Sequence, residues 1–282
     1  MTITPRLFLI AALIASFAPR AAAAGERAVA RIVAFGGVCA RCELSGRKLA
    51  GAHFIGADFS GSALVGADLR NSHFIGSNFV GADLSRADMS GADMAGVNFG
   101  QANLSGARLK GAELRATNLA GANLAGADAA GVEVQGGNLT RANLSRAMLA
   151  GAQLMGAMLS GADARRTSFR GAGLQAAVLA NGRFDDASFR GAAMSYSVLT
   201  GGSFSGADFR DADLTGAIIA GADLSQAYGL KQEQLDDACG DSRTRAPGRL
   251  IVRACTALRI FVRRAPAVQA TQTGQRYLMI GR

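Results

Sequence analysis

Residues 56–70 read Gly-Ala-Asp-Phe-Ser, Gly-Ser-Ala-Leu-Val and Gly-Ala-Asp-Leu-Arg, three variants of one five-residue unit. The same spacing extends in both directions, because every fifth residue from Leu44 to Leu224 is apolar, over 37 consecutive units. A period of five fits neither the 3.6 residues of a helical turn nor the two-residue alternation of a strand. The chain is therefore predicted to turn once in every unit.

Each unit has fixed positions around its apolar centre. A small residue, usually Ala, lies two positions before the centre, and Gly lies two positions after it in 24 of the 37 units. The position directly before the centre is Asp or Asn in 17 units. Gly adopts positive φ without strain, and Asp and Asn bond to their own nearby backbone, so both favour turns. The pattern predicts a solenoid in which each coil buries its apolar edge against its neighbours.

The composition excludes other kinds of repetitive chain. Among 282 residues there are 37 Gly, only 4 Pro and no Trp, and 49% of the residues are hydrophobic. Collagen has a three-residue Gly period and abundant Pro, coiled coils are rich in Glu and Lys, and disordered chains contain few apolar residues. The high Gly content instead follows from the turn position of the repeat.

The units resemble those of the pentapeptide-repeat family, whose consensus is Ala-(Asp/Asn)-Leu-X-X, over about two thirds of the chain. The resemblance implies an all-β solenoid, a right-handed quadrilateral parallel β-helix with 20 residues per coil and about nine coils over residues 43–228. The bulky centres support this coil length, because stacked coils should place Phe on Phe. Six pairs of Phe centres are 20 residues apart: 54 and 74, 59 and 79, 79 and 99, 169 and 189, 184 and 204, and 189 and 209.

Residues 1–24 are predicted to form a secretory signal peptide. An apolar run over residues 7–18 follows Arg6, and the small residues 21–24 suit a signal peptidase, so cleavage is expected after Ala24. The run is too short to anchor the chain across a bilayer, although Arg20 in the cleavage region leaves an uncleaved anchor as the alternative. The mature protein is expected to be periplasmic or secreted, in an oxidising compartment.

Both ends of the repeat region are expected to carry caps, because a solenoid leaves open strand edges there. The N-terminal cap comprises residues 25–42 and the C-terminal cap residues 229–255. Residues 230–240 are predicted to form a short helix that ends at Gly240. The stretch from Gln234 to Asp241 resembles the helix-plus-disulfide cap of exported pentapeptide-repeat proteins.

Each cap contains two cysteines, Cys39 and Cys42 at one end and Cys239 and Cys255 at the other. A rod with the coils that the resemblance implies is about 43 Å long at about 4.8 Å per coil, whereas a disulfide needs Cα atoms within about 7 Å. The expected disulfides therefore join Cys39 to Cys42 and Cys239 to Cys255. A redox-active Cys-x-x-Cys motif at residues 39–42 is the alternative.

The formal net charge of +9 describes the ends of the chain more than its body. Residues 43–228 carry a net charge of −1, whereas residues 240–282 carry +8. Residues 256–282 are expected to form a basic, flexible tail. Such a tail binds anionic lipid, polysaccharide or nucleic acid, or it is a solvated extension.

In a 20-residue coil, residues 20 apart stack in columns on the outer faces, and two columns are candidate binding surfaces. The candidate anion-binding column consists of Arg170, Arg190 and Arg210. Nearby Asp residues at 185, 186, 208 and 211 provide the alternative, in which they simply neutralise the column. The candidate docking or dimer face, here named the apolar ladder, consists of Met158, Val178, Val198 and Ile218.

A third column has the residue types of a metal site. It consists of His53, His73, Asp93, Glu113 and Glu133. Imidazole and carboxylate ligands suit zinc, but stacked polar residues on an outward face are the favoured explanation of the column. No metal or other cofactor is therefore predicted.

An enzyme is not predicted, because the chain has two His and neither neighbours a Ser or Cys nucleophile in the repeat register. The favoured hypothesis is an exported structural or protein-interaction scaffold with an unidentified protein partner, or with a second copy of itself. The alternative is a binder of anionic lipid, polysaccharide or nucleic acid through the basic tail and the Arg column. The family's DNA mimicry towards DNA gyrase requires an acidic surface and a cytoplasmic location, which a neutral rod behind a signal peptide does not fit.

Overall fold

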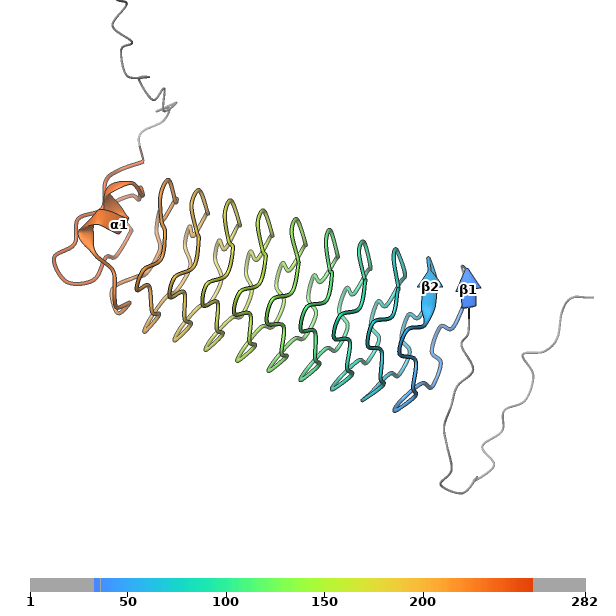
Figure 1. The fold of residues 1–282 in the computed structure, drawn as a ribbon. Coiled ribbons are helices and arrows are strands. Elements are labelled where there is room, and N and C mark those ends of the chain that lie inside the picture. Colours follow the sequence, from blue (N-terminus) through green and yellow to red (C-terminus); the bar gives the residue numbers. More distant parts are fainter. Residues whose placement is uncertain (1–32, 36, 256–282) are drawn as a thin grey trace, which may run out of the picture.

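The computed structural model describes residues 33–35 and 37–255, which form a single rod of stacked coils (Figure 1). The predicted signal peptide at residues 1–24 and the predicted basic tail at residues 256–282 lie outside the described residues. Within the described part, no helix is long and apolar enough to cross a membrane.

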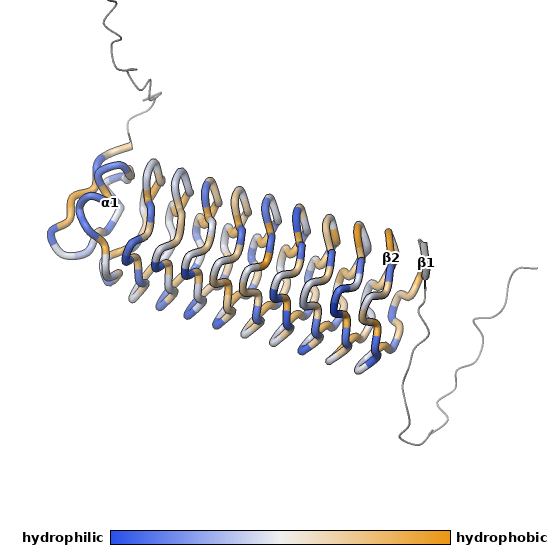
Figure 2. The backbone as a smooth tube through the Cα atoms, in the orientation of Figure 1, coloured by the Kyte–Doolittle hydropathy of each residue, from blue (hydrophilic) through white to orange (hydrophobic). Residues whose placement is uncertain are grey.

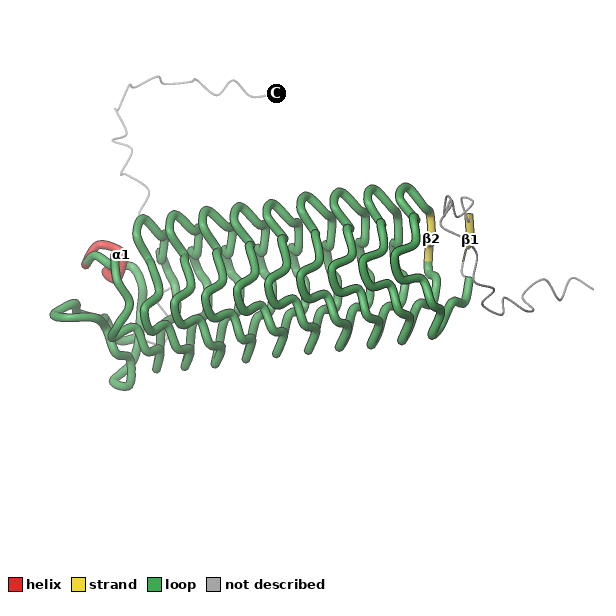
Figure 3. Tube along the Cα trace, turned by 90° about the horizontal axis from the view of Figure 1, so that it is seen from below, coloured by secondary structure: helices red, strands yellow, loops and turns green. Residues whose placement is uncertain are grey.

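Parallel backbone pairing between residues 20 apart builds the rod. Strand β1 (Val33–Phe35) pairs with strand β2 (His53–Ile55) in the register Val33 with His53. Beyond β2 the same pairing continues as single-residue bridges, from Asp58 with Asn78 up to Asp208 with Tyr228. Most of the rod is therefore drawn as loop in Figure 3, although its backbone is bonded from coil to coil. The bridges confirm the 20-residue coil.

The repeat register begins before residue 43. Because Val33 already pairs with His53 and Val38 with Asp58, the segment predicted to be an N-terminal cap contributes the first rungs of the rod. Cys39 fits this register, since its amide N–H donates to the carbonyl of Asp58 at 2.7 Å.

The core is a continuous column of apolar centres and the small residues that precede them. Nine Phe side chains in the repeats are among the largest fully buried ones, and the small residues between them, such as Ala82 and Ala187, are buried as well. Phe rings stack from coil to coil, with centroids 4.8 Å apart for Phe59 and Phe79 and 5.1 Å apart for Phe189 and Phe209. Figure 2 shows apolar and polar segments alternating along every coil.

The turns follow the predicted chemistry. Gly residues two positions after the centres have positive φ, and Asp or Asn before the centres accepts a backbone N–H two residues later, as in the bond of 3.0 Å from Ser60 to Asp58. Among the described residues, thirteen that are not Gly occupy the positive-φ position, and several of them, including Arg146, Arg166 and Tyr196, lie on surfaces discussed below.

Helix α1 (Gln232–Asp236) lies at the end of the rod opposite β1 and β2 (Figure 1). A helix is present within the predicted residues 230–240, but the prediction that it ends at Gly240 is wrong. The helix ends at Asp236 because the chain beyond it returns to coil pairing, with Cys239 bridged to Ile218 and Gly240 to Ala254. Cys239 lies 21 residues after its partner Ile218 and Arg245 lies 22 residues after Asp223, instead of 20, because the chain contains extra residues here, whereas Gly240 and Ala254 are 14 residues apart and pair within the cap.

Candidate interaction surfaces

The apolar ladder forms one straight column on a face of the rod. Successive bridges join Met158 to Val178, Val178 to Val198 and Val198 to Ile218. Met158 is 43% exposed and Ile218 39%, whereas the two Val side chains are partly buried. The structure thus places all four predicted residues on consecutive coils of one face.

The same column carries polar side chains in the preceding coils. Asn138 is bridged to Met158 and continues a run of Asn residues at positions 78, 98 and 118. Asn118 donates from Nδ2 to Oδ1 of Asn98 at 2.9 Å, and its own Oδ1 accepts the amide N–H of Ala120 at 3.2 Å. Aliphatic and thioether side chains cannot form either bond in this way. The change from Asn to apolar residues therefore removes a supporting hydrogen bond from four consecutive turns.

Two exposed side chains that the sequence analysis missed border the ladder. Met155, 55% exposed, and Tyr196, 67% exposed, lie in the turns that precede Met158 and Val198 along the chain. Tyr196 has a φ of 60° at a position that the repeat usually gives to Gly, and this departure was visible in the sequence. On the other side of the ladder the turns carry the small residues Ser160, Ala180, Thr200 and Ala220, so the apolar surface is concentrated in the ladder itself, Met155 and Tyr196.

The predicted anion-binding column is largely neutralised by carboxylates. Arg210 forms two hydrogen bonds to Asp208, at 2.9 and 2.7 Å, and Arg190 lies 3.9 Å from Asp211. The hydrogen bonds from Arg210 hold the pKa of Asp208 below its usual value. Arg170 forms no ion pair with any residue in the described ranges. Only one of the three predicted guanidinium groups is therefore left without a carboxylate.

The His-containing column brings its two imidazoles together. The rings of His53 and His73 are stacked with centroids 4.2 Å apart. Among residues 33–35 and 37–255, no group of three or more His, Cys, Asp or Glu side chains is arranged to hold a metal ion. The column is therefore described as a stack of polar side chains.

Both predicted cysteine pairs lie at disulfide distance. The Cα atoms are 5.3 Å apart for Cys39 and Cys42 and 4.8 Å apart for Cys239 and Cys255. The first pair lies on the first rungs of the rod, and the second joins the coil behind α1 to the end of the described chain. One cysteine pair therefore lies at each end of the rod.

Two family models described as Pentapeptide repeats match the chain, one over five overlapping segments between residues 39 and 174 and the other over residues 184–227. Together they cover most of the described rod, and the chain belongs to the pentapeptide-repeat family. Proteins of this family fold as right-handed quadrilateral β-helices, in agreement with four five-residue units per coil.

Solved structures of the same family resemble the chain at low identity. QnrB1, a plasmid-mediated fluoroquinolone resistance protein, is 23% identical over 64% of this chain and 90% of its own, with a TM-score of 0.42. HetL from the cyanobacterium Nostoc sp. strain PCC 7120, involved in heterocyst differentiation regulation, is 28% identical over 64% and 88%, with a TM-score of 0.33. A pentapeptide repeat protein from the Arabidopsis thaliana thylakoid lumen is 29% identical over 41% and 79%, with a TM-score of 0.26. No curated protein matches the chain.

Proposed function

We propose that this protein is an exported, non-enzymatic scaffold, a rod of about nine coils closed by a short helical cap, which binds a protein partner on its apolar ladder. The observation that carries the proposal is the replacement of Asn by four apolar side chains on consecutive coils of one face. Exposed, contiguous apolar side chains mark interaction surfaces.

The local energetics support this interpretation. Each Asn that becomes Met, Val or Ile loses a turn hydrogen bond that contributes about 0.5–1.5 kcal/mol, and the fold gains little in return because two of the four side chains remain exposed. Burial under a partner offsets this loss at about 25 cal/mol per Å² of apolar surface. The ladder is therefore explained by binding better than by the stability of the rod.

A second copy of the chain is the partner that the ladder fits best. Its side chains recur at the spacing of bonded strands, about 4.8 Å, so the ladder of one copy matches that of another when the two are related by a twofold axis. Export is supported by the apolar run over residues 7–18 and by two cysteine pairs at disulfide distance.

Substituting Val178 and Val198 with Asn tests the proposal without endangering the fold, because Asn already occupies the same column in four earlier coils, at positions 78, 98, 118 and 138. Sedimentation velocity should show a dimer for the natural chain and a monomer for V178N/V198N, while circular dichroism is unchanged.

The matched control is S168N/S188N. These residues lie in the same coils and at the same position of the unit, but half a coil away on the opposite face. This variant should remain dimeric. A monomeric natural chain, or equal dissociation of both variants, would contradict self-association through the ladder.

A further inference from the structure

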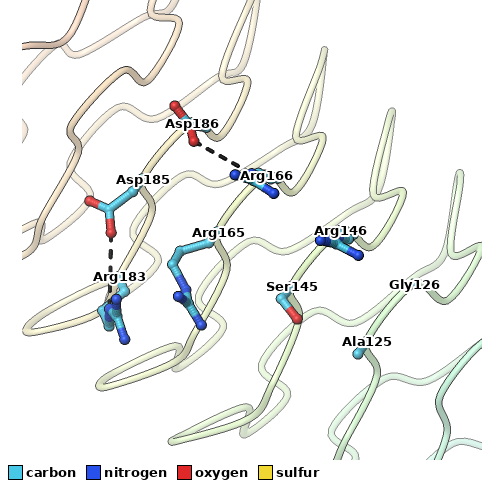
Figure 4. A pocket seen from close by; sticks show the side chains of 9 residues that line it. All are labelled: Ala125, Gly126, Ser145, Arg146, Arg165, Arg166, Arg183, Asp185 and Asp186. Carbon is cyan, nitrogen blue, oxygen red and sulfur yellow. Dashed lines mark ion pairs between the residues drawn. The ribbon is translucent and has the colours of Figure 1, made fainter.

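A groove enriched in Arg crosses several coils of the rod (Figure 4). Its residues occupy other positions of the 20-residue register than the apolar ladder. Its volume is about 640 Å³, and its charged lining residues are Arg146, Arg165, Arg166, Arg183, Asp185 and Asp186. Small residues at the other end, including Gly126 and Ser145, leave space in front of the arginines. The four arginines come from three consecutive coils.

One of these arginines is paired with a carboxylate at the surface of the rod. Arg165 donates from Nε and Nη2 to the two carboxylate oxygens of Asp163, at 2.8 and 2.6 Å. This pair keeps the pKa of Asp163 below its usual value. Because Asp163 neutralises its charge and takes two of its five N–H donors, Arg165 contributes less to ligand binding than an unpaired guanidinium group.

The other three guanidinium groups retain their hydrogen-bonding capacity. Arg166 lies 3.6 Å from Asp186 and Arg183 lies 3.9 Å from Asp185, and both separations are too long for hydrogen bonds. Arg146 has no ion-pair partner in the part of the chain that the structure describes. Arg166 and Arg183 are 62% and 59% exposed, so their donors are open to a ligand.

The backbone conformation and the charge of Arg146 and Arg166 both destabilise the rod. Both have positive φ, 60° and 58°, where the same column carries Gly at 106, 126 and 206. A side chain in this left-handed conformation costs roughly 1–2 kcal/mol compared with a right-handed one, a penalty that Gly avoids. The two positive charges are also one rung apart, at which spacing like charges repel. Within the described chain Arg146 has no ion-pair partner, and the 3.6 Å pair between Arg166 and Asp186 is too long for a hydrogen bond, so compensation for these effects is small.

We propose that this groove binds an acidic oligosaccharide, with Arg146, Arg166 and Arg183 holding its carboxylate or sulfate groups. Charge-assisted hydrogen bonds from Arg to such anions are strong and geometrically specific. The site is separate from the apolar ladder and does not depend on the proposed dimer.

The remaining lining residues favour a sugar over other polyanions. Asp185 and Asp186 would accept hydrogen bonds from sugar hydroxyls, whereas they repel the closely spaced phosphates of a nucleic acid. The lining contains no aromatic side chain on which bases stack. It also lacks the large apolar side chains that insert into a lipid surface. A ligand that carries both acid and hydroxyl groups fits this mixture of Arg and Asp.

The test compares two variants of the full chain that lose equal charge at equivalent turns. R146G/R166G removes the groove's two turn arginines, and R86G/R141G removes two others that also have positive φ but lie outside the groove. Gly is the usual residue at these turns, so both variants should fold. Because both retain residues 256–282, any contribution of the tail is common to them.

Titration calorimetry with a heparin-derived hexasaccharide at physiological salt should show about tenfold weaker binding for R146G/R166G, while R86G/R141G changes the affinity by less than about twofold. Equal losses in the two variants, or unchanged binding in both, would overturn the site. Parallel titrations use a single-stranded oligonucleotide and anionic phosphatidylglycerol vesicles. Tighter binding of either probe, with the same dependence on Arg146 and Arg166, would overturn the assignment to a sugar.

Discussion

At the scale of single residues, two glycines in the core are needed because a neighbouring ring leaves no room for a Cβ atom, and not because the chain turns there. Gly182 and Gly202 occupy the small inward position that is usually Ala, and neither has positive φ. A Cβ atom on Gly182 would lie 2.5 Å from Cε2 of Phe184, and one on Gly202 would lie 2.8 Å from Cε2 of Phe204. Each Phe ring therefore fills the volume that an Ala methyl group occupies elsewhere.

We expect Gly182→Ala to destabilise the rod, although Ala is the common residue at this position. The added methyl group must displace a fully buried ring, and overpacking of this kind costs about 1–3 kcal/mol. Urea denaturation followed by circular dichroism measures the change.

The control is the double variant G182A/F184L, which restores the usual combination of Ala with Leu. Its stability should exceed that of G182A alone, because the smaller centre leaves room for the methyl group. If G182A proves as stable as the natural chain, the ring is not confined in the way described.

The sequence was sufficient to predict which residues point inward and which turn. Apolar centres such as Leu64 and turn glycines such as Gly61 are fixed by the five-residue period, and the structure has them as expected. The role of Gly182 was not predictable, because it depends on the direction in which the ring of Phe184 extends across the coil.

At the scale of elements, α1 is attached to the rod through one polar and one apolar side chain. Gln234 donates from Nε2 to the carbonyl oxygens of Phe209 and Ala212, at 2.9 and 2.8 Å, and Leu235 is fully buried. The Gln234 amide thus binds carbonyls of the last coils, and the helix covers the core at this end.

Replacing Gln234 with Ala should loosen this end of the rod. The variant leaves two carbonyl groups without their side-chain donor, which should lower the free energy of local opening by about 1–3 kcal/mol. Hydrogen exchange of the amides around Phe209 and Ala212 measures this opening.

Glu233→Ala provides a matched comparison, because Glu233 lies on the same helix with an exposed side chain. Its exchange rates should remain close to those of the natural chain. Similar acceleration in both variants would show that loss of helix propensity, and not the bonds from Gln234, opens this end.

The sequence predicted a helix at this end but extended it too far. The composition of residues 230–240 is compatible with helix throughout, yet Cys239 bonds to the backbone around Ile218 and cannot also continue the helix. Bonds between distant residues determined the boundary, and local sequence carries no signal for them.

At the scale of the whole molecule, carboxylates with lowered pKa values are distributed along the rod. Hydrogen bonds from Arg70, Arg165 and Arg210 lower the pKa of Asp68, Asp163 and Asp208 respectively. Near the C-terminal end, hydrogen bonds from Arg243 lower the pKa of Asp241 to about 2. All of these carboxylates are more acidic in the folded chain than the usual value of about 3.9 for an unfolded one.

The rod should therefore lose stability in acid. A carboxylate with a lowered folded pKa stabilises the fold above its unfolded pKa, and this contribution disappears as the pH falls from about 4 towards 2. The midpoint of thermal unfolding should be nearly constant between about pH 6 and pH 5 and should decline steadily below about pH 4.

Asp241→Asn separates the contribution of one carboxylate. This variant should unfold at a lower temperature than the natural chain near neutral pH, and the two curves should converge near pH 2. A constant difference at every pH would mean that the Asp241 side chain acts through packing and not through its charge.

The candidate surfaces were predictable only in part. The 20-residue register was enough to align Met158, Val178, Val198 and Ile218, because columns follow directly from the coil length. Which arginines are paired was not predictable, since Arg210 and Arg165 form hydrogen bonds to carboxylates that depend on side-chain conformation. The groove was missed because its residues come from two adjacent turn columns and a neighbouring face.

The coil pairs residues 20 apart while the repeat unit has five residues, and this ratio governs how the protein tolerates changes in length. The Arg groove and the apolar ladder share coils, so gain or loss of a single unit before residue 125 would rotate both together by a quarter of a turn relative to the first coils, which contain Cys39 and Cys42. Gain or loss of four units there would keep both surfaces on their faces and alter only their distance from the first coils. Duplication or deletion within the gene can therefore set the angle between the binding surfaces and the N-terminal end of the rod in four discrete steps, with no change to the residues of either surface.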